Sequence, residues 1–289
     1  MSIVVANGAR IPSLGYGTYG MRRNDMLRMI PHVLRAGFRH IDTAQMYGNE
    51  AEVGEGWVAS GVSRQEIFIT TKVWVANYHA ARFERSIDES LYKLRTDYID
   101  LLLLHWPGST VPLADQIGSL NAVQRAGKVR HIGVSNFNAR LMMEAVRLSE
   151  VPLVTNQFEY HPYLGQSYLT AQTRRAGLAV TGYCGMAVGR VLSDPILQAI
   201  AQRYHRSVAQ VVLRWLVQQD GVVALSRTLH EERAAQNLEI FDFSLDGEDM
   251  AAIHALAAPD SRIVNPPGLA PLWDPTDQGS LRTRKTIHL

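Results

Sequence analysis

Four polar residues in the first half of the chain have side chains suited to delivering a proton to a developing oxyanion. Asp42 and Tyr47 lie close together in the run Ile-Asp-Thr-Ala-Gln-Met-Tyr-Gly-Asn-Glu, and Lys72 and His105 each follow a later apolar run. A tyrosine hydroxyl has a pKa of about 10, and a lysine ammonium beside it would favour the phenolate and lower that pKa. A carboxylate would hold the lysine charged, and a histidine would polarise a carbonyl oxygen through a second hydrogen bond.

Each of these residues also has an ordinary structural explanation when it is taken alone. Asp42 could cap a strand, Tyr47 could be a packing aromatic, and a lysine or histidine closing one buried strand is usually a hydrogen-bonded structural residue. The repetition favours a site, because polar groups that close seven successive strands would meet at one mouth, where each needs a partner. The other members are Ser135 with Asn136, Gln157, Tyr183, and the run Ser226-Arg227-Thr228.

The same residue types indicate which reaction class to expect. We find no nucleophile next to a base, and the histidines lack the spacing of metal ligands such as His-Glu-x-x-His, so no metal is expected. Protonating an oxyanion without a covalent nucleophile requires an electron source, and protein side chains offer no hydride. The pattern therefore predicts a redox cofactor in the mouth.

Eight predicted strands alternate with helices and would position these side chains. The run Leu101-Leu-Leu-Leu104 is continuous, as in a strand buried on both faces. No linker rich in Gly, Pro or Ser interrupts the alternation, so we predict one α/β domain over residues 1–289. No Gly-x-Gly-x-x-Gly follows the first strand, so we predict that this domain is a (β/α)8 barrel rather than an open doubly wound sheet. The predicted strands span residues 14–18, 39–42, 67–72, 98–105, 129–134, 153–157, 178–183 and 222–225.

Segments at both ends of the chain lie outside the repeated unit. An Asn7-Gly8 turn predicts an N-terminal β-hairpin that covers the bottom of the barrel. After the eighth strand and its helix, residues 245–257 predict an extra helix. The Pro-rich tail, residues 259–289, is expected to fold over one mouth of the barrel, with a disordered end as the alternative.

Composition excludes several classes of protein. The chain has 289 residues, of which 46% are hydrophobic and 19% charged, and its net charge of +2 favours neither nucleic acid nor a membrane surface as a partner. One cysteine, Cys184, fits a reducing compartment. Because the N-terminus lacks a signal pattern and no apolar window is long enough to span a membrane, we expect a cytoplasmic protein. We expect a monomer, although the sequence has no surface stripe from which an oligomeric state could be read.

Five motifs together give the chain a specific resemblance to the aldo-keto reductases over essentially its whole length. They are Asp-Thr-Ala-x-x-Tyr-Gly-Asn-Glu at 42–50, Thr-Thr-Lys-Val-Trp at 70–74, Leu-Leu-His-Trp-Pro at 103–107, Ile-Gly-Val-Ser-Asn-Phe at 132–137 and Asn-Gln-Phe-Glu-Tyr-His-Pro at 156–162. Within the family, residues 183–190 and 262–274 are similar to the bacterial diketo-gluconate reductases, some of which also reduce methylglyoxal.

The resemblance implies a role for each polar strand end. Asp42, Tyr47, Lys72 and His105 would form the catalytic tetrad, with Tyr47 as general acid in reduction and general base in oxidation. Tyr183 would stack on the nicotinamide ring. Ser135, Asn136 and Gln157 would bind the nicotinamide carboxamide, and Gly17, Thr18, Asp42 and Met186 are also expected to contact the cofactor.

The family's phosphate-binding motif maps onto residues after the eighth strand. Arg227, Thr228 and Arg233 would bind a ribose 2′-phosphate and Asn237 the adenine, so the resemblance implies NADPH rather than NADH. The match departs from the family at Ser226 and Arg227, where proline and lysine are usual, and after Tyr183, where Cys-Gly-Met replaces Ser-Pro-Leu. The alternative for Arg233 is a solvated helix residue.

The expected substrate is a small carbonyl compound, either a keto-aldehyde or a keto-sugar acid. Aromatic walls with few charges suit a neutral carbonyl better than a phosphorylated sugar. Two alternatives stay open: a reductase of a bulky keto compound, and a regulatory subunit that binds NADPH without turnover. The predicted pocket walls are Tyr19, Met46, Trp74, Trp106 and Trp273, each of which could equally be an ordinary core residue.

Overall fold

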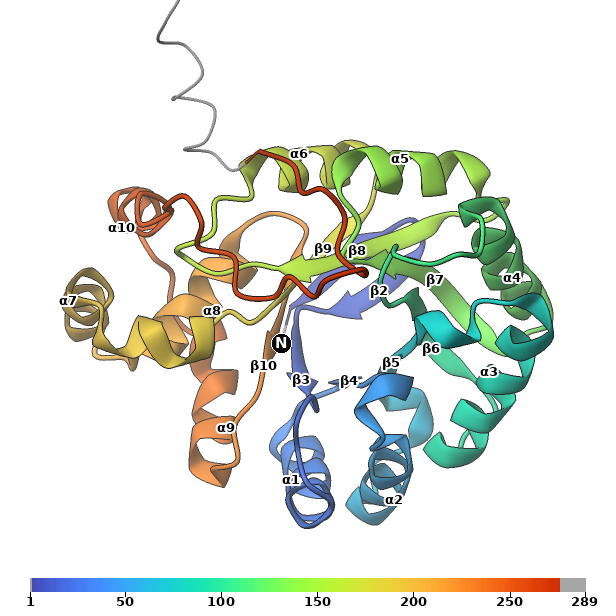
Figure 1. Cartoon of the computed structure of the whole chain (residues 1–289). Coiled ribbons are helices and arrows are strands. Elements are labelled where there is room, and N and C mark those ends of the chain that lie inside the picture. The colour runs from blue at the N-terminus through green and yellow to red at the C-terminus, as the bar shows by residue number, and fades with distance from the viewer. Residues whose placement is uncertain (1, 276–289) are drawn as a thin grey trace, which may run out of the picture.

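Eight parallel strands close into a barrel in the computed structural model, which describes residues 2–275 (Figure 1). Around the barrel the strands follow the order β10-β3-β4-β5-β6-β7-β8-β9, and β10 closes on β3 with Ala224 opposite Leu14. The predicted α/β barrel is therefore confirmed. The strands are β3 (Leu14–Gly17), β4 (His40–Asp42), β5 (Phe68–Val73), β6 (Ile99–Leu104), β7 (Val129–Ser135), β8 (Leu153–Glu159), β9 (Ala179–Tyr183) and β10 (Val222–Ser226).

Helices follow the strands and form an outer ring around the barrel (Figure 1). Two of them follow β9, and α10 comes after the last repeat. The close approach of α2 and α3 depends on Gly54, because a Cβ at this position would collide with the Lys93 carbonyl. The helices are α1 (Arg23–Ala36), α2 (Glu50–Ser60), α3 (Ala80–Leu94), α4 (Leu113–Arg125), α5 (Ala139–Leu148), α6 (Ser167–Arg175), α7 (Pro195–Arg203), α8 (Val208–Gln218), α9 (Glu231–Leu238) and α10 (Gly247–His254).

A two-stranded antiparallel hairpin covers the bottom of the barrel, as the Asn-Gly turn predicts. β1 (Ile3–Ala6) pairs with β2 (Ala9–Pro12), and the turn residues Asn7 and Gly8 both have positive φ. Ile11 packs with the inward-facing side chains of the barrel strands, including Phe68 and Leu101. The larger core cluster lies between the strands and the ring of helices.

The segment after α10 crosses the opposite mouth of the barrel, as predicted (Figure 1). We call residues 262–275 the C-terminal strap. Its backbone accepts a hydrogen bond from the Gly108 amide at Leu269 and from the Asn138 side chain at Leu272. A Cβ at Gly108 would lie 2.5 Å from the Gly268 carbonyl oxygen, so glycine is needed where the strap docks. The predicted tail continues to residue 289, and residues 276–289 lie outside the described part.

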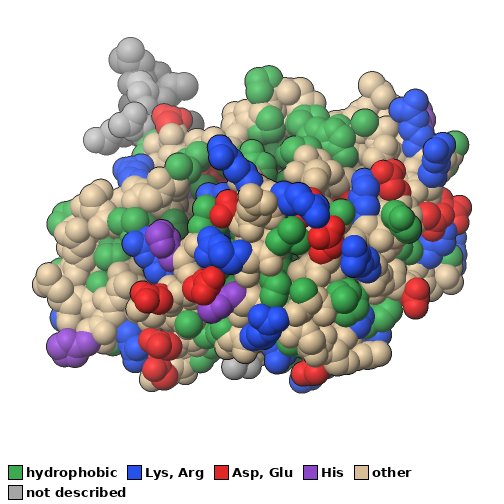
Figure 2. Space-filling view, turned by 90° about the horizontal axis from the view of Figure 1, so that it is seen from below, with side chains coloured by type: hydrophobic (Ala, Val, Ile, Leu, Met, Phe, Trp, Pro, Cys, Tyr) green, Lys and Arg blue, Asp and Glu red, His purple; other side chains and the backbone are tan. Residues whose placement is uncertain are grey.

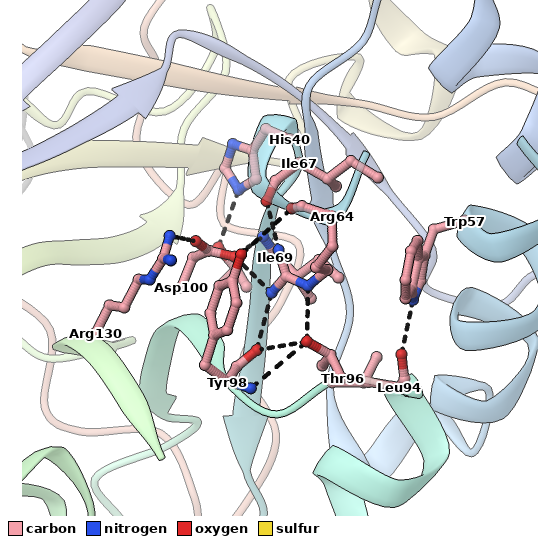
Figure 3. A network of polar contacts seen from close by, with 11 residues as sticks. His40, Trp57, Arg64, Ile67, Ile69, Leu94, Thr96, Tyr98, Asp100 and Arg130 are labelled. Atoms are coloured by element: carbon pink, nitrogen blue, oxygen red, sulfur yellow. Dashed lines mark hydrogen bonds and ion pairs between the residues drawn. The ribbon is translucent and has the colours of Figure 1, made fainter. Parts of the chain in front are cut away.

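A polar network ties the bottom of β5, β6 and β7 together (Figure 3). The buried carboxylate of Asp100 accepts hydrogen bonds from Arg64 at 2.7 Å, from the Ile69 amide at 3.0 Å and from Arg130 at 3.2 Å. Both guanidinium groups stack on the ring of Tyr98, at 4.1 and 3.7 Å from its centroid. This network lies at the end of the barrel away from the C-terminal strap.

The surface carries charges of both signs. On the face shown in Figure 2, Lys and Arg side chains are interspersed with Asp and Glu side chains, in keeping with the net charge of +2. Within residues 2–275, no helix combines the length and the apolar character needed to cross a membrane.

Candidate active site

Strand alternation brings two of the predicted residues, Lys72 and His105, to the inside of the barrel. Successive side chains of a strand point to opposite faces, so Lys72 shares the inner face of β5 with Phe68, and His105 continues the inner face that Leu101 and Leu103 occupy on β6. Lys72 donates from Nζ to Asp42 Oδ1 at 2.6 Å and to the Thr43 carbonyl at 2.8 Å. Only 1% of the Lys72 side chain and 3% of the Asp42 side chain are exposed, so this is a buried ion pair.

The second oxygen of Asp42 is also satisfied. Gln157, at the end of β8, donates from Nε2 to Asp42 Oδ2 at 2.8 Å. The loop beyond Asp42 is held by Asn49, whose Oδ1 accepts from the Thr43 hydroxyl at 2.9 Å and whose Nδ2 donates to the Thr18 carbonyl at 2.9 Å. The carboxylate is therefore fixed in place and has partners on both oxygens.

Tyr47 lies beside this ion pair on a short 3-10 turn, Gln45–Tyr47. The Lys72 ammonium is 5.1 Å from the centroid of the Tyr47 ring, and the His105 ring is 5.7 Å away in an edge-on arrangement. The structure thus brings together all four residues predicted as the tetrad. Among the described residues, the Tyr47 hydroxyl forms no hydrogen bond, so it can donate to a ligand.

Burial dominates the electrostatics of this cluster. It raises the pKa of Tyr47 well above 10.0, and the negative charge of Asp42 adds to the increase. The prediction that Lys72 lowers this pKa is therefore wrong for the protein alone, because the desolvation of the phenolate outweighs the nearby cation. Burial likewise lowers the pKa of Lys72, against the opposing effect of Asp42, and burial and Lys72 together lower the pKa of His105 well below 6.5. Tyr47 stays protonated and His105 neutral near pH 7.

The ends of β7, β8 and β9 form a second polar cluster beside the first. Tyr183 donates from its hydroxyl to Asn136 Oδ1 at 2.7 Å, and Asn136 donates from Nδ2 to the His105 carbonyl at 3.0 Å. The Ser135 hydroxyl donates to the Gln157 carbonyl at 3.0 Å. These four predicted cofactor residues therefore lie together and connect to the tetrad through His105 and Gln157.

The predicted phosphate-binding residues follow β10. Arg227 donates from Nη1 to the Tyr19 carbonyl at 2.8 Å, which ties the loop after β10 to the loop after β3. Thr228 accepts a hydrogen bond from the His230 amide at 3.1 Å. Arg233 is exposed on α9, where it has no ion pair within residues 2–275, whereas Asn237 is buried on the same helix.

The remaining predicted cofactor residues border the mouth at β3 and β9. Gly17 pairs with Asp42 across β3 and β4, and a Cβ at Gly17 would meet only the Ser226 carbonyl, at 3.8 Å. Met186 is partly buried in the loop after β9. Burial raises the pKa of the Cys184 thiol in the same loop, so the fold does not activate this thiol as a nucleophile.

Aromatic side chains line the mouth next to Tyr47 and His105. Tyr19 contacts Tyr47 with ring centroids 5.0 Å apart, and Trp74 contacts His105 at 5.4 Å. Trp106 stacks on His105 at 6.5 Å, and Trp273 of the C-terminal strap meets Trp106 at 6.5 Å. Of the five predicted wall residues, Met46 is the one without a ring contact; it lies next to Tyr47 in sequence and is 41% exposed.

Two charged residues near the mouth were missed by the sequence analysis. Glu159 is fully buried and accepts hydrogen bonds from the amides of Ile263 and Val264 at 2.7 and 2.8 Å, so it fastens the start of the C-terminal strap. Arg262 stacks on Trp273 with its guanidinium carbon 3.7 Å from the ring centroid. Glu159 belongs to the motif at 156–162 and Arg262 to the stretch 262–274, but no local pattern indicates that the backbone after Arg262 docks on Glu159.

The chain is similar to several known proteins. The family model described as the aldo/keto reductase family matches residues 13–258. Methylglyoxal reductase DkgB of Salmonella typhi is 38% identical over 267 residues, which cover 91% of this chain and 99% of the relative. Morphine 6-dehydrogenase of Pseudomonas putida is 39% identical over 280 residues, covering 90% and 94%.

A solved structure described as a putative 2,5-diketo-D-gluconic acid reductase B superposes with a TM-score of 0.94 at 57% identity, covering 95% of this chain and 98% of that one. This agrees with the resemblance of residues 183–190 and 262–274 to the diketo-gluconate reductases. The extent of these matches and the closed barrel lead to one conclusion: the chain belongs to the aldo/keto reductase family.

Proposed function

We propose that the protein is an NADPH-dependent carbonyl reductase in which Tyr47 donates the proton. The observation that carries the proposal is the buried Lys72–Asp42 ion pair beside Tyr47 and His105. Such a pair is costly to bury and contributes little to stability by itself, so a functional reason for it is favoured.

Each residue of the cluster has a distinct task in carbonyl reduction. Tyr47, protonated because burial raises its pKa, gives its proton to the oxygen of the carbonyl group as that oxygen gains charge. Neutral His105 orients this oxygen through a hydrogen bond, and the Lys72 ammonium stabilises the tyrosinate that remains. Asp42 and Gln157 keep Lys72 in place. A reduced nicotinamide, when bound, supplies the hydride that side chains cannot.

The residues around the mouth suit this cofactor. The Ser226 hydroxyl is buried and has no partner among the described residues, and the exposed cation of Arg233 has no counter-ion there. Phosphate oxygens would be suitable partners for each of these groups, because guanidinium and hydroxyl groups are good donors to phosphate oxygens. Ser135, Asn136, Gln157 and Tyr183 would hold the nicotinamide end, and Arg227, Thr228, Arg233 and Asn237 the adenosine end.

The proposed substrate is a small keto-aldehyde or keto-sugar acid. Relatives named methylglyoxal reductase and glyoxal reductase, and the 57% identical structure described as a diketo-gluconic acid reductase, support this class. The alternative is a bulky keto compound, which the similarity to morphine 6-dehydrogenase favours.

The test is the Tyr47→Phe variant, assayed by the ultraviolet absorbance of NADPH with methylglyoxal, 2,5-diketo-gluconate, aromatic aldehydes and polycyclic ketones. We expect turnover to fall by about 100-fold or more, the usual scale of general acid catalysis, while NADPH binding is retained. Tyr92→Phe is the matched control, because Tyr92 is 86% exposed on α3. A Tyr47→Phe enzyme as fast as the Tyr92→Phe enzyme would exclude Tyr47 as the proton donor.

A further inference from the structure

A cavity of about 310 Å³ lies between helices on the outside of the barrel. Its walls come from residues 160–167 after β8, from α6, from the end of α8 with the two residues after it, and from the end of α10 with Ala257. None of the residues proposed for catalysis, cofactor binding or the substrate pocket lines it. The cavity is therefore separate from the proposed reaction site, and its volume is at the lower end of the range for small-molecule sites, about 300–1,000 Å³.

Three of the residues that line this cavity carry a hydrogen-bonding atom without a partner. These atoms are Thr170 Oγ1 and Arg174 Nε on α6 and Trp215 Nε1 on α8, all shielded from solvent and all without a hydrogen bond within residues 2–275. Thr170 is 4% exposed and Trp215 1% exposed. A buried polar group without a partner is costly, so three around one cavity need an explanation.

The chemistry of these atoms indicates what the missing partner is. The indole N–H of Trp215 and the Nε–H of Arg174 can only donate, and the hydroxyl of Thr170 can donate as well. The three groups share a need for an acceptor, and a carboxylate offers two acceptor oxygens with room for several hydrogen bonds.

The N-terminus of α6 opens onto the same cavity. Gly165, Gln166 and Ser167 line it, and Gln166 is the N-cap residue of α6 but provides no side-chain hydrogen bond to the first turn. The first turn of a helix carries partial positive charge, which favours an anion nearby. The helix end therefore adds to the preference that the three donors already indicate.

Charge and shape narrow the ligand further. Arg174 forms no ion pair within residues 2–275, and Asp220 is the acidic residue among the described residues that line the cavity. Because the exposed carboxylate of Asp220 would repel a doubly charged phosphate more than a singly charged group, a carboxylate is favoured. Tyr160, Pro162 and Leu164 supply apolar wall for the rest of the molecule.

We propose that this cavity, the α6–α8 cavity, binds a small monocarboxylic acid with an apolar body, and that Thr170, Arg174 and Trp215 donate to its carboxylate. The site goes beyond the proposed carbonyl reductase function and does not depend on it. The three donors are shielded from solvent, so admitting the carboxylate requires a side-chain rotation, and Arg174 is the partly exposed member that can make it.

The test is a titration with benzoate of the protein labelled with fluorotryptophan, followed by fluorine NMR. We expect the Trp215 resonance, identified by its loss in Trp215→Phe, to shift in a saturable manner. The Kd from this shift should rise about 10-fold or more in Arg174→Gln and in Thr170→Val, because each loses a hydrogen bond to a charged group. Arg175→Gln is the matched control, because Arg175 is exposed on the same helix and does not line the cavity.

The other tryptophans distinguish the outcomes. Trp57, on α2, serves as the internal reference, because an unchanged Trp57 resonance shows that a variant is folded. Shifts confined to Trp74, Trp106 and Trp273 would place benzoate at the mouth and overturn the inference. A Kd at Trp215 that is equal in Arg174→Gln, Thr170→Val and Arg175→Gln would also overturn it. A tighter response of Trp215 to inorganic phosphate than to benzoate would refute the assignment to a carboxylate.

Discussion

Burial is the largest influence on the pKa values of Tyr47, Lys72 and His105 at the centre of the site. Tyr47 and Lys72 could each exist in either form at alkaline pH, and their sequence positions alone favour a lowered tyrosine pKa. In the folded protein the phenolate is poorly solvated, so Tyr47 keeps its proton, and His105 loses its charge for the same reason. A carbonyl oxygen that becomes an alcohol needs a proton, which a protonated tyrosine can give, and a neutral imidazole beside it can orient the oxygen through a hydrogen bond.

These directions predict the pH profile of carbonyl reduction. Because the pKa of His105 lies well below 6.5, kcat/KM should be level through neutral pH. Because the pKa of Lys72 is lowered from 10.5, kcat/KM should fall on the alkaline side below pH 10.5, as the ammonium loses its proton while Tyr47 keeps its own. The measurement is kcat/KM for methylglyoxal at saturating NADPH across this range.

A Lys72→Met variant should be slow, and its kcat/KM should not fall at alkaline pH, because methionine has no proton to lose at this position. A decline of kcat/KM centred near pH 6.5 in the wild-type enzyme would contradict the assignment of His105 as neutral.

At the scale of elements, α9 and the loop after β10 carry the cations proposed for the cofactor phosphate. Arg227 already uses one donor on the Tyr19 carbonyl, whereas Arg233 has no counter-ion among the described residues. Arg233 is therefore the group of α9 with its charge fully available to a 2′-phosphate.

Arg233→Ala should narrow the preference for NADPH over NADH. Removing one charge-assisted contact with phosphate costs about 1.5–3 kcal/mol, so the ratio of the two kcat/KM values should fall by roughly 10-fold or more. Arg82→Ala is the control for loss of a surface cation, because Arg82 is exposed on α3 and has no ion pair within residues 2–275. An unchanged preference in Arg233→Ala would mean that the 2′-phosphate is recognised elsewhere.

At the scale of the whole molecule, the residues proposed for catalysis lie at one end of the barrel, and a polar network that we expect to stabilise the fold lies at the other end. The mouth holds the tetrad and the C-terminal strap, whereas the bottom holds the hairpin and the network around Asp100 (Figure 3). Asp100 joins β5, β6 and β7, which are neighbours in the closed barrel, and lies far from any residue proposed for catalysis.

Asp100→Asn should therefore lower the free energy of unfolding by about 3–5 kcal/mol, because it leaves the buried Arg64 cation without a compensating charge. The measurement is urea unfolding at equilibrium. Glu144→Gln, which breaks the exposed pair with Arg140, should cost at most ~0.5 kcal/mol. Equal losses in the two variants would show that the network adds nothing to stability.

Local patterns in the sequence were enough to predict the barrel and the polar ends of its strands. Apolar runs and helical spacing are properties of neighbouring residues, so the bounds of the predicted strands lie within a few residues of the observed bounds. The alternation of side chains along β5 and β6 likewise follows from position alone and directs Lys72 and His105 inward. The residues proposed as the tetrad could be singled out from the sequence for the same reason.

Tertiary structure alone decided the contacts between distant segments and the electrostatics that follow from them. Gln157 donates to Asp42, Glu159 fastens the C-terminal strap, and Arg262 has no counter-ion within residues 2–275, although no local spacing relates any of these residues. The raised pKa of Tyr47 depends on how much water the surrounding chain removes, which is a property of packing. Residue types determined which chemistry is available, and the closed barrel determined which groups remain charged, paired or free to use it.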